Sequence, residues 1–208
     1  MYKIVSAGLG LALLTACGGT GSTDSGSFNA LAGEYNDLAN EYSRTGLVGA
    51  ADLALAGSAT YDGAMRIQVD TPQTTDILGE ARIGVNFGTD TVAASFGNFV
   101  GRANGQPIEA WTETVPVQAG GGIDVSQTAN QYIQTTLRGT LRSATGNVLT
   151  LGPVPLDGSF RDTVPNRLSF PDAMVLQTGP GSIRLDGVNY GVELGSGCET
   201  CAIVVAEN

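Results

Sequence analysis

The strongest structural signal in this sequence is a pair of alternating runs between residues 80 and 97. Apolar residues occupy every second position of each run, so they share one face of an extended chain. These positions are Ala81, Ile83, Val85 and Phe87 in the first run, and Val92, Ala94 and Phe96 in the second. Gly88-Thr89-Asp90, a turn-forming sequence, joins the runs. A period of two around a turn predicts a β-hairpin with one apolar face.

A hairpin alone is only marginally stable in water, so this apolar face needs more sheet to cover it. Other strand-like stretches separated by Gly, Asp and Asn turns are 57–69, 130–142, 148–151, 156–161, 182–194 and 202–206. Residues 99–111 are less regular, with a tight-turn signal at Asn104-Gly105, and Val115–Gly122 is predicted to be a loop. About eight to ten strands with such turns predict an all-β fold, an antiparallel sheet that forms a closed barrel or a sandwich. The glycines inside the strands favour a barrel, because they permit tight bends and close approach.

A segment with a helical period precedes the strands. Its apolar positions are Phe28, Leu31, Tyr35, Leu38 and Tyr42, with acidic residues between them. This spacing predicts an amphipathic helix of about four turns. Such a helix could bind a partner or a membrane surface, or it could pack on the sheet or across one end of a barrel. Packing is favoured, because an acidic polar face is unsuited to anionic lipid.

The first residues have the features of an export signal. Lys3 is followed by an apolar run over residues 4–14, which is too short for a permanent membrane span. The run ends in Leu14-Thr15-Ala16-Cys17, which resembles a bacterial lipobox, so we expect Cys17 to be lipidated. Two or three acyl chains would then anchor the protein stably. Gly18 after the cysteine favours sorting to the outer membrane. The alternative to a lipobox is an ordinary signal peptide that happens to be followed by a cysteine.

These features predict four parts of the chain. Residues 1–16 form the lipoprotein signal peptide, and residues 17–27 form a flexible Gly/Ser/Thr tether. Residues 28–56 contain the helix and a linker, and residues 57–208 form the β-barrel domain. A membrane-spanning barrel is not expected, because the chain lacks aromatic girdles and carries a lipoprotein signal.

Composition limits the classes of function. The formal net charge is −10, and a nucleic-acid partner is not expected because a phosphate backbone requires a basic surface. The sequence contains no histidine, and its only lysine is Lys3. The commonest general base and metal ligand and the usual amine nucleophile are therefore missing from the mature chain. We therefore predict that the protein is not an enzyme and has no cofactor or metal site. In the minor alternative of a carboxylate-based enzyme, the candidate catalytic acids are Glu109 and Glu113.

Several short motifs point to a known family. They are Tyr61-Asp62-Gly63, Val85-Asn86-Phe87, Val92-Ala93-Ala94, Gly139-Thr140-Leu141 and Gly158-Ser159-Phe160. In these motifs the chain resembles the β-barrel domain of transferrin-binding protein B, and more closely the short single-barrel lipoproteins of proteobacteria that share it. The likeness covers most of residues 57–165. It implies an eight-stranded antiparallel barrel with a binding role at the cell surface or in the periplasm, but not transferrin binding, since the motifs describe barrel architecture.

A second pair of cysteines, Cys198 and Cys201, lies between two predicted strands. A redox C-x-x-C usually precedes a helix, and β-branched residues follow here instead. Zinc would need two further ligands in a chain without histidine. A local disulfide between Cys198 and Cys201 is favoured in an oxidising envelope compartment.

The sequence therefore favours a lipid-anchored binding module of the outer membrane, held there through Cys17. A protein partner would contact loops on the barrel, because long loops on a rigid scaffold often carry recognition. The candidate loops are Asp70–Leu78, Gly101–Gly122 and Pro165–Gly181. The alternative is a structural envelope lipoprotein that contacts other outer-membrane components.

Overall fold

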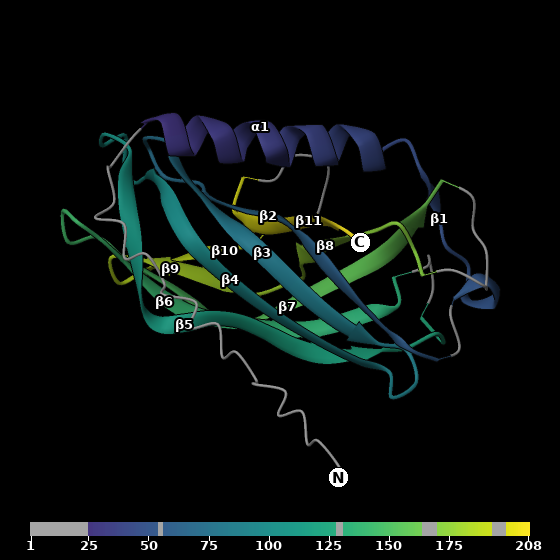
Figure 1. Cartoon of the computed structure of the whole chain (residues 1–208). Helices are drawn as coiled ribbons and strands as arrows, with labels where there is room; N and C mark the ends of the chain where they lie inside the picture. The colour runs from purple at the N-terminus through teal and green to yellow at the C-terminus, as the bar shows by residue number, and fades with distance from the viewer. Residues whose placement is uncertain (1–24, 54–55, 128–130, 164–169, 193–198) are drawn as a thin grey trace, which may run out of the picture.

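The computed structural model describes residues 25–53, 56–127, 131–163, 170–192 and 199–208. Cys17 and Cys198 lie outside these residues, as does the predicted signal peptide. One long helix, α1 (Ser25–Tyr42), lies along the outside of a β-barrel (Figure 1).

Eight antiparallel strands form the closed barrel, which confirms the predicted fold class. In spatial order they are β2 (Ser58–Val69), β3 (Thr75–Asn86), β4 (Thr91–Arg102), β5 (Glu109–Ile123), β6 (Ile133–Ser143), β7 (Val148–Asp162), β8 (Ala173–Thr178) and β11 (Cys201–Glu207). The barrel closes because β11 pairs with both β2 and β8, and β8 also pairs with β7.

Four short elements lie outside this ring of strands. They are β1 (Gly46–Leu47), the 3-10 helix η1 (Ala50–Asp52), β9 (Ser182–Leu185) and β10 (Val188–Gly191). β1 pairs with β7, and the hairpin of β9 and β10 is attached to the first part of β7. The turn of this hairpin is Asp186-Gly187, where the sequence predicted a break, and both residues have a positive φ.

The hairpin predicted from the alternating runs is β3–β4. Val85 lies opposite Val92, and Ala81 lies opposite Phe96. Every apolar residue predicted for its inner face is buried in the barrel core. A register shift follows near Gly97, so the alternation resumes out of phase with Phe99 pointing inward.

Side chains fill the barrel interior. The ring of Phe160 lies 5.5 Å from that of Phe87 and 6.4 Å from that of Tyr61, measured between centroids. Met65 and Leu137 are also fully buried. An interior packed in this way stabilises the barrel through apolar burial and dispersion, and in the described part of the chain its core positions are occupied by side chains.

Glycines permit close contact where the barrel closes. A Cβ atom on Gly63 of β2 would lie 2.2 Å from the carbonyl oxygen of Val205 on β11. A Cβ atom on Gly158 of β7 would lie 2.4 Å from the carbonyl oxygen of Val175 on β8. Both glycines lie in short sequence motifs noted above, and their role here is architectural.

Several details of the strand prediction were wrong, and β8 lies in residues 165–181, which were predicted to be a loop. Val115–Gly122 is not a loop but lies within β5, where register shifts between Glu113 and Gln118 disturb the alternation. Residues 148–151 and 156–161 do not form separate strands but belong to β7. Pro153 and Pro155 interrupt the pattern there, and they lie where β7 changes its neighbour from β9 to β8. Proline has no main-chain N–H to donate, so a strand tolerates it where one of its sides has no neighbouring strand to accept that hydrogen bond.

The amphipathic helix packs on the outside of the barrel, against β2, β3, β4 and β11, as the favoured interpretation predicted. Its predicted apolar positions are all buried, and they contact Ala64, Leu78, Ala173 and Val205. The helix begins at Ser25, so its first turn includes the last residues of the expected tether. Among the residues described, no helix is long and apolar enough to cross a membrane.

Candidate functional site

The predicted recognition loops are shorter than expected. Within Asp70–Leu78, β3 already begins at Thr75, and most of Gly101–Gly122 is strand. Pro165–Gly181 contains β8, and its residues 165–169 lie outside the described part. Much of the predicted loop sequence is therefore strand in the described part of the chain, and the binding role of these loops stays a prediction.

Glu109 and Glu113 both lie on β5 but serve different local structures. The buried Glu109 carboxylate accepts hydrogen bonds from the backbone nitrogen (2.9 Å) and Oγ1 (2.7 Å) of Thr145, in the turn between β6 and β7. The exposed Glu113 accepts a hydrogen bond of 3.4 Å from the backbone nitrogen of Val117. The two acids therefore accept hydrogen bonds from two different local structures, a turn and a bulge. No cluster suited to holding a metal ion occurs within the described ranges.

Cys201 is buried and disulfide-bonded. Its neighbour in the C-x-x-C sequence, Cys198, lies outside the described residues, so the pairing of these two cysteines stays a prediction.

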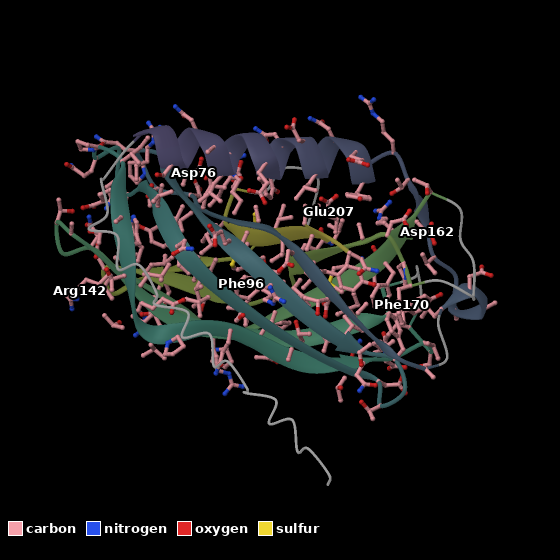
Figure 2. The ribbon with its side chains drawn as sticks, in the orientation of Figure 1. Asp76, Phe96, Arg142, Asp162, Phe170 and Glu207 are labelled. Atoms are coloured by element: carbon pink, nitrogen blue, oxygen red, sulfur yellow. The ribbon has the colours of Figure 1, made fainter. Side chains whose placement is uncertain are left out.

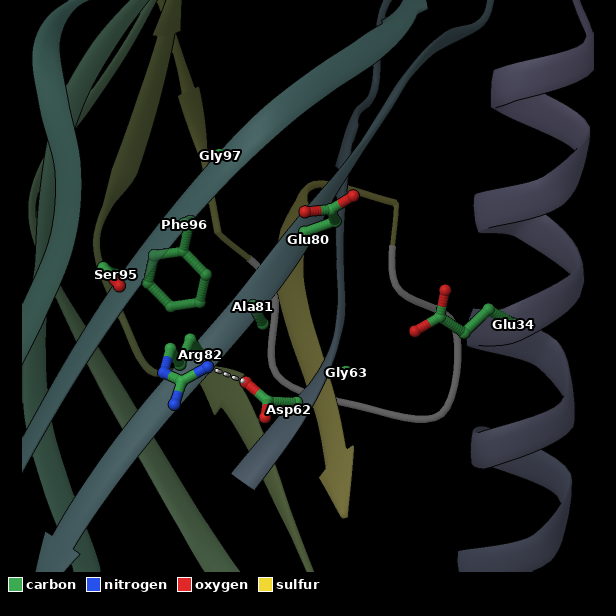
Figure 3. Close-up of a pocket in the computed structure, with 9 residues that line it drawn as sticks. All are labelled: Glu34, Asp62, Gly63, Glu80, Ala81, Arg82, Ser95, Phe96 and Gly97. Atoms are coloured by element: carbon green, nitrogen blue, oxygen red, sulfur yellow. Dashed lines mark ion pairs between the residues drawn. The ribbon is translucent and has the colours of Figure 1, made fainter. Parts of the chain in front are cut away.

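A large depression lies on the outside of the barrel, beside the first half of α1, with a volume of about 970 Å³. α1 forms one side of it through Ala30 and Glu34, and β4 and β5 form its floor through Gly97, Val100 and Ala110. A second depression of about 430 Å³ adjoins it over β2, β3 and β4 (Figure 3). We call the two depressions together the helix-wall groove.

The two depressions share Glu34, Glu80 and Gly97. In Figure 3, Glu34 extends from α1 towards the sheet, where Glu80 lies on the outer face of β3. The groove therefore runs between the helix and the sheet rather than into the barrel.

A local irregularity of the sheet forms the floor of the groove. The β4–β5 ladder is interrupted between the pairs Ser95–Gln118 and Phe99–Trp111. Asn98 lies in this interruption with a φ of 52°, and its Nδ2 donates a hydrogen bond of 2.6 Å to Oε2 of Glu80. A bulge of this kind leaves some main-chain groups unpaired across the ladder.

Acidic side chains surround the groove. Glu34, Glu80 and Glu113 come from three different elements, and all three are exposed. In the described part of the chain, none of them forms an ion pair. Arg82 and Asp62 also line the groove, where they lie 3.3 Å apart in an exposed ion pair. The groove therefore has a negative rim above a small, largely apolar floor.

Polar and aromatic contacts hold α1 beside this groove. Nε and Nη2 of Arg66 donate hydrogen bonds of 2.9 and 2.8 Å to the two carboxylate oxygens of Asp76. The same guanidinium lies 5.8 Å from the ring centroid of Tyr35 on the helix. At the C-terminal end of α1, the Tyr42 hydroxyl donates a hydrogen bond of 3.2 Å to Glu207. Figure 2 shows Asp76 and Glu207 beneath the helix, so contacts in its middle and at its C-terminal end attach α1 to the barrel.

Sequence reasoning did not find the helix-wall groove. Its lining comes from a helix and several strands that are distant in the chain, and its floor depends on a bulge. The only local signal was Gly97-Asn98, where a small residue and a residue tolerant of positive φ interrupt the alternation of β4.

The chain matches no protein-family model, no curated protein and no solved structure.

Proposed function

We propose that this protein is a lipid-anchored, non-enzymatic binding module of the bacterial outer membrane. In this proposal Cys17 carries the anchor, and the outer face of the barrel with α1 presents the binding surface. The proposal rests chiefly on the contrast between a barrel interior filled by side chains and an open groove on the barrel's outside.

The sequence supports the anchor. Leu14-Thr15-Ala16-Cys17 follows an apolar run of export-signal length. The glycine- and serine-rich residues between Cys17 and α1 suit a flexible connection between a membrane and a folded domain.

The family relationship is part of the same proposal. An eight-stranded barrel agrees with the likeness to transferrin-binding protein B-like lipoproteins. Gly63 and Gly158, which belong to the shared motifs, lie where close approach of neighbouring strands requires glycine. These residues support a common architecture and carry no information about the ligand.

Membrane attachment can be tested by fractionating Gram-negative cells that produce the full chain. Wild-type protein should sediment with outer membranes and incorporate an alkyne-labelled fatty acid. Cys17→Ser should lose the label and move to the soluble envelope fraction, whereas Ser22→Ala in the tether should behave as wild type. Membrane retention of unlabelled Cys17→Ser would overturn the proposed anchor.

The accessible face of the membrane can be tested by adding protease to intact and lysed cells. Digestion in intact cells supports binding of an external partner. Digestion only after lysis would replace that role with the structural alternative, in which the barrel contacts other components of the envelope.

A further inference from the structure

We propose that the helix-wall groove binds an extended basic segment of a partner protein, in which arginine or lysine side chains flank small apolar residues. This inference rests on the proposed binding role but not on the lipid anchor.

The charge of the groove favours a cationic ligand. Glu34, Glu80 and Glu113 approach it from α1, β3 and β5, so no single flexible segment brings the negative charges together. Arg82 is paired with Asp62, and in the described part of the chain none of these three acids forms an ion pair. The formal net charge of −10 adds a longer-range attraction for a basic partner.

The interrupted ladder favours an extended polypeptide over a compact cation. Gly97 and Asn98 of β4 and Thr112 and Glu113 of β5 line the groove and lie inside the interruption between these strands. The interruption offers no free sheet edge, because Gly97 pairs with β3, and Thr112 and Glu113 with β6, on their other sides. It nevertheless forms an elongated floor along which the side chains and polar main-chain groups of an extended segment can make contacts. A Cβ atom placed on Gly97 would meet no atom within 4 Å, so the floor is open at this point.

Other occupants fit less well. A second copy of this acidic chain would bring like charge towards the groove, and an anionic lipid surface would do the same. The small residues on the floor, Gly97, Val100 and Ala110, leave space for short apolar side chains between the basic ones.

The test uses a fluorescein-labelled peptide of about eight residues that alternates arginine with alanine or leucine, ~26 Å long when extended. Its binding to the full chain in non-ionic detergent is measured by fluorescence anisotropy at about 50 mM salt, where screening is weak. A matched peptide with glutamate in place of arginine should not bind. Equal binding of both peptides would overturn the proposal.

The first variant combines Glu34→Gln, Glu80→Gln and Glu113→Gln, which removes the charges but retains acceptor oxygens. We expect affinity for the arginine peptide to fall about tenfold, because several weak exposed ion pairs are lost together.

The matched control combines Asp37→Asn, Glu41→Gln and Asp90→Asn, which removes the same net charge at exposed positions outside the groove. Its affinity should change less than about twofold. An equal fall in both triple variants would show attraction by net charge alone and would overturn the groove as the binding site.

A second pair of variants leaves charge unchanged. Gly97→Leu should fill the floor and weaken binding about tenfold through steric exclusion. Gly84→Leu, on the same outer face but outside the groove, should bind as wild type, because its added Cβ atom meets only the Ala93 oxygen at 3.9 Å. Wild-type affinity in Gly97→Leu would overturn the proposal. The peptide-binding results have no bearing on the fractionation of Cys17→Ser, so the groove and the lipid anchor are tested separately.

Discussion

Two apolar clusters stabilise this protein, and they differ in what surrounds them. The cluster inside the barrel is enclosed on all sides and includes the fully buried Tyr61 and Phe160. The cluster between α1 and the outside of the barrel is bordered by the Arg66–Asp76 ion pair and by the Tyr42–Glu207 hydrogen bond. The inner cluster maintains the closed barrel, whereas the outer one attaches a helix and leaves a groove beside it.

This difference is the reason why we propose a binding surface on the outside of the barrel. A filled interior has little space for a ligand, and most of its side chains cannot change without loss of packing. The outer cluster covers only part of the sheet, so the adjoining surface remains open to a partner. Variants of the two clusters should therefore separate stability of the barrel from attachment of the helix.

The largest effect is expected inside the barrel. Phe160→Ala should lower the free energy of unfolding by about 3–5 kcal/mol, because it leaves a cavity beside Tyr61 and Phe87. Urea unfolding followed by circular dichroism measures the loss. Val188→Ala, at a residue that is 54% exposed, should change stability by less than about 0.5 kcal/mol.

A smaller effect is expected beneath the helix. Leu38→Ala should cost about 2 kcal/mol, because the partly open interface can relax around the cavity. Asn36→Ala, on the exposed face of the same helix, is the control and should be nearly neutral. If Leu38→Ala costs as much as Phe160→Ala, the distinction between an essential inner cluster and an accessory outer one is wrong.

The ion pair under α1 should contribute less than either apolar contact. Arg66→Met should destabilise the protein by about 1–2 kcal/mol, because it leaves the largely buried Asp76 carboxylate without its donor. The double variant Arg66→Met with Asp76→Leu should recover much of this loss. Arg82→Met, which removes the exposed partner of Asp62, should cost less than about 0.5 kcal/mol in the same unfolding assay.

The smallest effect is a pH dependence of helix attachment. Burial, followed by the nearby Glu207, raises the pKa of Tyr42 to about 12 from an ordinary 10.0, and burial also raises the pKa of Tyr35. The tyrosine hydroxyls therefore ionise at a lower pH in the unfolded chain than in the folded chain. The stability contributed by the protonated, buried tyrosines is present below pH 10 and falls as the pH rises towards 12. Tyr42→Phe should flatten the pH dependence of the unfolding midpoint in this range, and an unchanged slope would contradict the assignment.

Local patterns predicted much of the fold. The alternation around Ile83 and Val92 identified the β3–β4 hairpin, and the spacing of Leu31 and Tyr35 identified the buried face of α1. The predictions failed where tertiary context overrides periodicity, at the bulged β5 and at the proline-containing β7. Cys17 and Cys198 stay predictions, because they lie outside the described residues.

The sequence by itself determined most of the strand faces and the helix, because period and turn residues are local properties, whereas the export signal and the lipobox stay predictions. Only the tertiary structure decided which side of the sheet α1 covers, how β11 closes the barrel and where the helix-wall groove lies. These features depend on register and on packing between residues far apart in the chain, such as Glu34 and Glu113, and no local pattern encodes such distances.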